Sequence, residues 1–176
     1  MYSPKGKPGL ASDCQVGSPS QAIDFNLSHS GDLAVYAVAR DCDVGVDVEQ
    51  LRPIAEALQI AEKFFSAPER AELATVPHAQ LPEAFLNCWT RKEAYVKALG
   101  DGLSAPLDSF QVSLLPGRPA EFINMSGASM NEKEWLLRDL QPSPGYVAAL
   151  AFRRPQRRLR IRNFTTTTEA AEVISA

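Results

Sequence analysis

Residues 44–49 constrain the fold of this chain more than any other stretch, because valine alternates there with Gly45, Asp47 and Glu49. An alternation with a period of two is typical of a β-strand that has one apolar face. Both carboxylates therefore point to the same side of the strand, and Gly45 leaves space beside them. The pattern predicts a strand that presents two acids to the element packed on that side.

A second stretch, residues 89–97, carries polar groups that can meet those acids. Trp89, Glu93 and Lys97 are spaced four residues apart, which places them on one side of an α-helix. If this helix lies across the strand, three carboxylates and one ammonium group converge. Carboxylates that lie so close resist joint ionisation unless a cation lies between them. Hard oxygen ligands of this kind suit Mg²⁺ that is shared with the phosphates of a substrate.

The same residues also have simpler explanations. Asp47 and Glu49 fit an exposed face at the end of a hairpin. Glu93 and Lys97 fit an ion pair on a helix surface, which stabilises a protein by only about 0.3–0.5 kcal/mol. The acids alone do not decide between a metal site and a solvated surface.

The order of five short motifs along the chain favours the metal site. They are Gly6-Lys7-Pro8, Phe25-Asn26-Leu27-Ser28-His29-Ser30, Gly45-Val46-Asp47-Val48-Glu49, Phe64-Phe65-Ser66, and Trp89 with Lys92-Glu93-Ala94 and Lys97-Ala98-Leu99-Gly100. In this order they resemble the 4′-phosphopantetheinyl transferases over about residues 5–103. The resemblance is to the longer, monomeric, two-lobed branch of that family, which modifies acyl and peptidyl carrier proteins.

This resemblance implies an enzyme that transfers the 4′-phosphopantetheine group of coenzyme A to a serine of an acyl or peptidyl carrier protein, with release of 3′,5′-ADP. It implies that Asp47, Glu49 and Glu93 bind Mg²⁺. Glu93 is also a candidate base for the acceptor hydroxyl. Lys97 resembles the family lysine that contacts the transferring phosphate, where its charge stabilises the transition state.

The resemblance also assigns three residues to phosphate binding. Lys7, Ser28 and His29 fall in motifs that family members use to bind coenzyme A. Glu69 stays open between two roles: it aligns with a proposed base of some relatives, and it also completes a helix capping box with Ser66. Trp89 is expected to pack rather than to react.

Two other functions remain open from the sequence. One is a non-catalytic remnant of the family that binds coenzyme A or a carrier protein. The other is an unrelated Mg²⁺-dependent phosphate hydrolase that uses the same acids and needs no carrier serine.

The expected fold is α+β, with two related α/β lobes arranged as a pseudo-dimer. Residues 1–104 form the N-terminal lobe with the long linking helix, and residues 105–176 form a C-terminal lobe made mostly of strands. Because family members carry a further stretch before the Gly-Lys-Pro motif, we expect the N-terminal lobe to be incomplete. Strands 33–39 and 44–49 are predicted to pair as a hairpin. A helix is predicted over residues 82–99, closed by Gly100.

Composition excludes several classes of protein. Hydrophobic residues make up 45% and charged residues 22% of the chain, values typical of a soluble globular protein. The net charge of −3 argues against a nucleic-acid partner. No apolar run reaches membrane-spanning length. The three cysteines are scattered, which fits reduced thiols in the cytoplasm.

Overall fold

The computed structural model describes residues 23–100, 106–125, 134–153 and 158–164. Its strands and helices, in chain order, are β1 (Ile23–Ser30), β2 (Leu33–Arg40), β3 (Val44–Gln50), α1 (Ala57–Phe64), α2 (Ala67–Leu73), η2 (His78–Gln80), α3 (Leu81–Leu99), η4 (Leu107–Ser109), β4 (Phe110–Val112), β5 (Phe122–Met125), β6 (Trp135–Leu140) and β7 (Tyr146–Arg153). Helices and strands are mixed along the chain, so the expected α+β class is confirmed. No helix of the described residues is long and apolar enough to cross a membrane.

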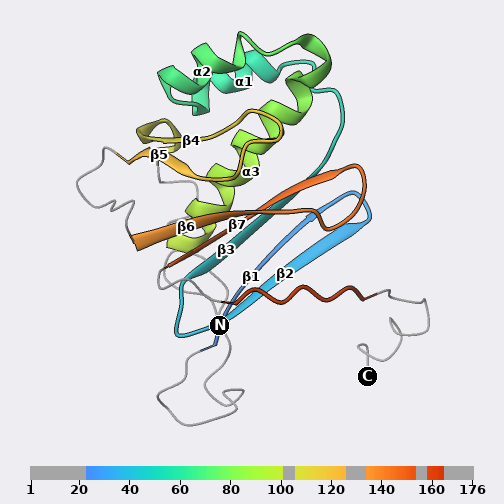
Figure 1. The fold of residues 1–176 in the computed structure, drawn as a ribbon, viewed down its shortest axis with the longest axis vertical. Coiled ribbons are helices and arrows are strands. Elements are labelled where there is room, and N and C mark those ends of the chain that lie inside the picture. Colours follow the sequence, from blue (N-terminus) through green and yellow to red (C-terminus); the bar gives the residue numbers. More distant parts are fainter. Residues whose placement is uncertain (1–22, 101–105, 126–133, 154–157, 165–176) are drawn as a thin grey trace.

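A three-stranded antiparallel sheet lies at the centre, in the order β3-β7-β6 (Figure 1). Its side chains alternate between two buried faces, as the period of a strand requires. One face packs in the main core with α3, and the other packs against β2. The first face includes Leu137, Ala149 and Ala151, and the second includes Val44, Val46, Leu150 and Phe152.

The predicted hairpin between strands 33–39 and 44–49 is wrong. β2 pairs instead with β1, in register from Ile23 and Arg40 to Ser30 and Leu33. The two-residue turn between them starts at Gly31, whose φ of 56° glycine adopts more readily than residues with a side chain. β3 pairs with β7, whose partner residues lie about a hundred positions further along the chain. The short connection at Asp41–Asp43 therefore leads from one sheet into another.

The long helix α3 agrees with its prediction to within one residue. Its C-terminus is capped by Gly100 at φ 71°, with the Gly100 N–H bonded to the Val96 and Lys97 carbonyls. α1 and α2 lie near the N-terminal half of α3 (Figure 1). The rest of α3 covers β3 and β7. The helix therefore joins the small helices to the sheet.

The proposed division into lobes at residues 104 and 105 remains a prediction, as does the pseudo-dimer arrangement. β3 and β7 belong to opposite sides of that division and pair directly. The main core likewise draws on both, since it contains Tyr95 from α3 and Trp135 from β6 with ring centroids 5.0 Å apart. The described residues of the two parts therefore share one core.

Candidate functional site

The site depends on an unusually close approach of α3 to β3. A Cβ atom added to Gly45 would collide with the backbone of Ala94 and Ala98. Because glycine has no side chain, the helix can rest directly on the strand. The residues that follow on the same face of β3, Asp47 and Glu49, then lie beside the helix face that carries Glu93 and Lys97.

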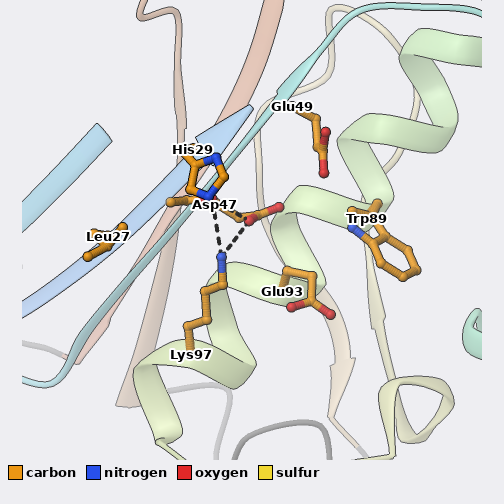
Figure 2. Close-up of a pocket in the computed structure, with 8 residues that line it drawn as sticks. Leu27, His29, Asp47, Glu49, Trp89, Glu93 and Lys97 are labelled. Carbon is orange, nitrogen blue, oxygen red and sulfur yellow. Dashed lines mark hydrogen bonds and ion pairs between the residues drawn. The ribbon is translucent and has the colours of Figure 1, made fainter. Parts of the chain in front are cut away.

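These side chains line one pocket of about 350 Å³ (Figure 2). Its walls come from β1, β3 and α3, which are far apart in the sequence. The lining residues are Leu27, Ser28, His29, Asp47, Glu49, Trp89, Glu93 and Lys97. The structure thus brings together six of the predicted site residues, from three motifs: Ser28, His29, Asp47, Glu49, Glu93 and Lys97. Their chemical roles remain predictions.

Asp47 is the most buried acid of the pocket, at 5% exposed. Its Oδ1 accepts hydrogen bonds from Ser28 Oγ at 2.8 Å and from Lys97 Nζ at 2.6 Å. Its Oδ2 is buried and has no hydrogen-bond partner among the described residues. Burial raises the pKa of the Asp47 carboxyl, while the Lys97 ammonium acts in the opposite direction.

Glu93 has a similar environment. Its Oε1 is also buried without a partner in the described part of the chain. Burial raises the pKa of the Glu93 carboxyl, and the neighbouring charges of Asp47 and Glu49 raise it further. The raised pKa values mean that Asp47 and Glu93 are both stabilised either by a proton or by a nearby cation.

A divalent cation fits this arrangement, although the acids do not form a ready-made cage. Within the described residues, no group of three or more His, Cys, Asp or Glu side chains is arranged to hold a metal ion as it stands. The donor set is nevertheless all carboxylate oxygen, and two of the oxygens are buried with no partner in the part of the chain that the structure describes. Such orphaned acceptors are costly unless something pairs with them. Asp47, Glu49 and Glu93 are the residues that could hold Mg²⁺.

The predicted phosphate-binding residues differ in their surroundings. His29 is exposed at the rim of the pocket, where its imidazole is accessible to a ligand. The Ser28 hydroxyl donates to Asp47 and accepts from Lys97 Nζ at 3.2 Å and from the Val48 N–H at 3.3 Å. One donor and two lone pairs are then all used within the protein. Lys7 lies outside the described residues.

Trp89 forms the aromatic wall of the pocket. Its ring stacks on Phe85 at a centroid distance of 6.1 Å and meets Phe64 edge-on at 5.7 Å. These contacts anchor the middle of α3 to α1. The expectation that Trp89 packs agrees with this geometry.

Glu69 and Lys92 form a buried ion pair away from the pocket. Lys92 Nζ lies 2.8 Å from Glu69 Oε2, and both side chains are fully buried. Glu69 also accepts the Ser66 N–H at 2.7 Å, as the capping box predicts, and the Val112 N–H at 2.8 Å. Every oxygen of this carboxylate is engaged, so the capping role is the one that its contacts support.

The sequence analysis missed Ser30. Its hydroxyl donates to Glu49 Oε2 at 2.9 Å and accepts the Gln50 N–H at 3.1 Å. The signal was present, because Asn26, Ser28 and Ser30 alternate along β1 and so share one side of the strand. The polar run over residues 28–31 also resembles a turn, which obscures this alternation.

Comparison with known proteins identifies the family. The model of the 4′-phosphopantetheinyl transferase superfamily matches residues 43–151, more than half of the chain. The chain belongs to this superfamily. The match contains β3, α3 and the pocket acids that they carry.

Several relatives in curated collections carry the same name. HetI of Nostoc sp., a 4′-phosphopantetheinyl transferase, is 36% identical over 150 residues, which are 85% of this chain and 58% of HetI. The transferase psf-1 of Bacillus pumilus is 45% identical over 93 residues, which are 53% of this chain and 39% of that protein. A solved Chronobacterium ammoniagenes ACPS–CoA complex covers 66% of this chain at 24% identity, with a TM-score of 0.48. The chain thus spans less than two thirds of these two transferases.

Proposed function

We propose that this protein transfers the 4′-phosphopantetheine group of coenzyme A to a serine of an acyl or peptidyl carrier protein. The observation that carries the proposal is the pocket in which Asp47, Glu93 and Lys97 converge from β3 and α3. The transferase names of the relatives support the same reaction. We place the reaction in the cytoplasm, because Cys42 and Cys88 are free thiols.

In this reaction the carrier serine oxygen attacks the β-phosphorus of coenzyme A. A new phosphorus–oxygen bond forms, and the bond to the 3′,5′-ADP leaving group breaks. Asp47, Glu49 and Glu93 would hold Mg²⁺, which neutralises charge on the pyrophosphate. The serine proton passes to a carboxylate of the pocket, for which Glu93 is the candidate.

Lys97 and His29 supply the remaining polar groups. The Lys97 ammonium points into the pocket beside Asp47 (Figure 2). At the transferring phosphoryl group it would stabilise the charge that develops on the oxygens. His29 would bind a phosphate of the nucleotide from the pocket rim, and Lys7 would contact another. Positioning and electrostatics then supply most of the rate enhancement.

The test uses the full chain, Mg²⁺, coenzyme A and several apo carrier proteins. Each carrier is weighed by mass spectrometry, and a carrier that gains the phosphopantetheine mass supports the proposal. Binding of coenzyme A without any mass gain favours a non-catalytic binder. Release of 3′,5′-ADP without a carrier favours a hydrolase. Either of these results contradicts the transferase.

A matched pair of variants tests the metal acids. Asp47→Asn should lower the transfer rate by about a hundredfold or more, the loss typical when a charge-stabilising group is removed. Asp43→Asn changes an acid of the same type only four positions earlier, where Asp43 forms a surface ion pair with Arg153. It should transfer at the rate of the unaltered protein. Equal rates for the two variants would refute the assignment of Asp47.

A further inference from the structure

β1 and β3 are joined by side chains instead of by backbone pairing. Asn26 Oδ1 accepts the Val46 N–H at 2.9 Å, and Ser28 Oγ accepts the Val48 N–H at 3.3 Å. Ser30 Oγ accepts the Gln50 N–H at 3.1 Å. Alternate N–H groups of an edge strand point to the same side, so three successive outward N–H groups of β3 are satisfied in this way.

Two of these three contacts continue to the candidate metal ligands. The Ser28 hydroxyl donates to Asp47 Oδ1 at 2.8 Å, and the Ser30 hydroxyl donates to Glu49 Oε2 at 2.9 Å. A hydroxyl has one proton to donate. Because the backbone N–H fixes the lone pair of each serine, the remaining proton is directed at the carboxylate. Each serine therefore connects the backbone of β3 to an acid on the same strand.

We infer that Ser28 and Ser30 are positioning residues, each of which occupies one oxygen of a metal-binding carboxylate and leaves the other oxygen for the cation. Asp47 agrees with this directly, since its Oδ1 is bonded and its Oδ2 is buried and unpartnered within the described residues. For Glu49, Oε2 is bonded to Ser30, and the side chain lines the pocket. The inference rests on the proposed function. It gives Ser28 a role other than binding coenzyme A.

The arrangement has two physical consequences. A carboxylate held at one oxygen by a serine hydroxyl is restricted in its rotation, so its other oxygen stays available to a cation. It also loses less side-chain entropy when the ion binds, because the hydrogen bond has already restricted its rotation. Partners that orient metal ligands in this way commonly change metal affinity by about ten- to a hundredfold when removed.

The test compares Ser30→Thr with Ser30→Val. These side chains have nearly the same shape and both suit a strand, but only threonine keeps the hydroxyl. Mn²⁺ is titrated into each full-length variant without coenzyme A, and the free ion is followed by electron paramagnetic resonance. We expect Ser30→Val to bind Mn²⁺ about ten- to a hundredfold more weakly than the unaltered protein. Ser30→Thr should recover most of the affinity.

Asn26→Ala is the control for the contacts between the strands. It removes one of the three contacts to β3, and among the described residues Asn26 forms no hydrogen bond with an acid of the pocket. We expect it to lower the melting temperature and to leave Mn²⁺ affinity unchanged. Equal affinity of the threonine and valine variants would overturn the role of Ser30.

The outcomes also separate this inference from the proposed function. If the unaltered protein binds Mn²⁺ and Asp47→Asn does not, the metal site stands whatever the serine variants show. If the unaltered protein binds no Mn²⁺, the metal assignment fails and the positioning role fails with it. For Ser28, Ser28→Ala should weaken Mn²⁺ binding but leave coenzyme A binding in EDTA unchanged. Loss of coenzyme A binding in EDTA would return Ser28 to the phosphate-binding role.

Discussion

Two lysines of α3 each pair with a carboxylate of another element, and the two pairs differ in how many of their polar atoms have partners. Lys92 and Glu69 are both 0% exposed, whereas the Lys97 side chain is 30% exposed beside Asp47. Lys92 donates to the Leu107 and Phe110 carbonyls at 2.7 and 2.6 Å. In the first pair all three ammonium donors and both carboxylate oxygens have partners, whereas the second pair leaves Asp47 Oδ2 buried without a partner among the described residues.

One helix can thus serve both stability and chemistry. A buried pair in which every donor and acceptor is used can hold elements together, because removing one partner leaves an unpaired charge in the core. A pair with an unused oxygen at a pocket can accept a ligand. The two lysines lie only five residues apart, so burial and partners distinguish their roles and residue type does not. The following predictions test that distinction.

The largest effect is expected from Lys92→Met. This change leaves the Glu69 carboxylate buried without its cation, and removal of one partner of such a pair typically costs about 3–5 kcal/mol. Urea denaturation at neutral pH measures the loss in the free energy of unfolding. A loss below about 1 kcal/mol, the range of an exposed pair, would contradict the distinction.

Lys97→Met should have the opposite effect, with a small change in stability and a large change in transfer rate. Because Lys97 is partly exposed, its loss should lower the free energy of unfolding by no more than about 1 kcal/mol. The transfer rate should fall by about a hundred- to a thousandfold, since the charge at the phosphoryl group is lost. Steady-state kinetics with an apo carrier protein and urea denaturation of the same preparation provide the two measurements. A variant that keeps its rate would remove Lys97 from the mechanism.

Gly45→Ala tests whether the contact between Lys97 and Asp47 depends on the close approach of α3 to β3. The new methyl group meets backbone atoms of Ala94 and Ala98, which cannot rotate away. Such overpacking typically costs about 1–3 kcal/mol, and it separates Lys97 from Asp47. We expect lower stability in urea together with weaker Mn²⁺ binding. Gly45→Val should have larger effects of both kinds, and a variant with normal stability and affinity would show that the close approach is not needed.

The sequence predicted α3 well because its signals are local. Pro82 in the first turn and Gly100 at the C-cap mark the ends, and the spacing of Trp89, Glu93 and Lys97 gives the face. The alternation of residues 44–49 likewise predicted which side chains share a face of β3. Both patterns depend only on neighbours along the chain, so the pocket acids could be named before the fold was known.

The pairing of β3 could not be predicted in the same way. Its partner β7 lies about a hundred residues away, and no local signal distinguishes it from β2. The tight turn at Gly31 decides that β2 pairs with β1, yet the longer connection at Asp41–Asp43 looks equally suitable for a hairpin. The contacts from Ser28 and Ser30 to β3 depend on this arrangement, which is why their link to the acids emerged only from the structure.

The smallest expected effect concerns Glu93, whose pKa is raised in the folded protein by burial and by the charges of Asp47 and Glu49. The folded state then binds its proton more tightly than the unfolded state does. Stability therefore falls as the pH rises from the ordinary pKa of a glutamate through the raised one, and the cost persists above it. Glu93→Gln removes this cost. At neutral pH in EDTA it should raise the melting temperature slightly, by about 1–3 °C.

The dependence of this small rise in melting temperature on pH and on metal links it to the Glu93 carboxyl. Below the ordinary pKa of a glutamate, Glu93→Gln and the unaltered protein should melt together, because the carboxyl is neutral in both states. Added Mg²⁺ should raise the melting temperature of the unaltered protein more than that of the variant, since a bound cation stabilises only the folded form. The exposed Glu121 provides the control, because Glu121→Gln should change neither result. A variant that melts lower than the unaltered protein in EDTA would mean that Glu93 is already paired, as Glu69 is, and the contrast between the satisfied buried pair and the open pocket would fail.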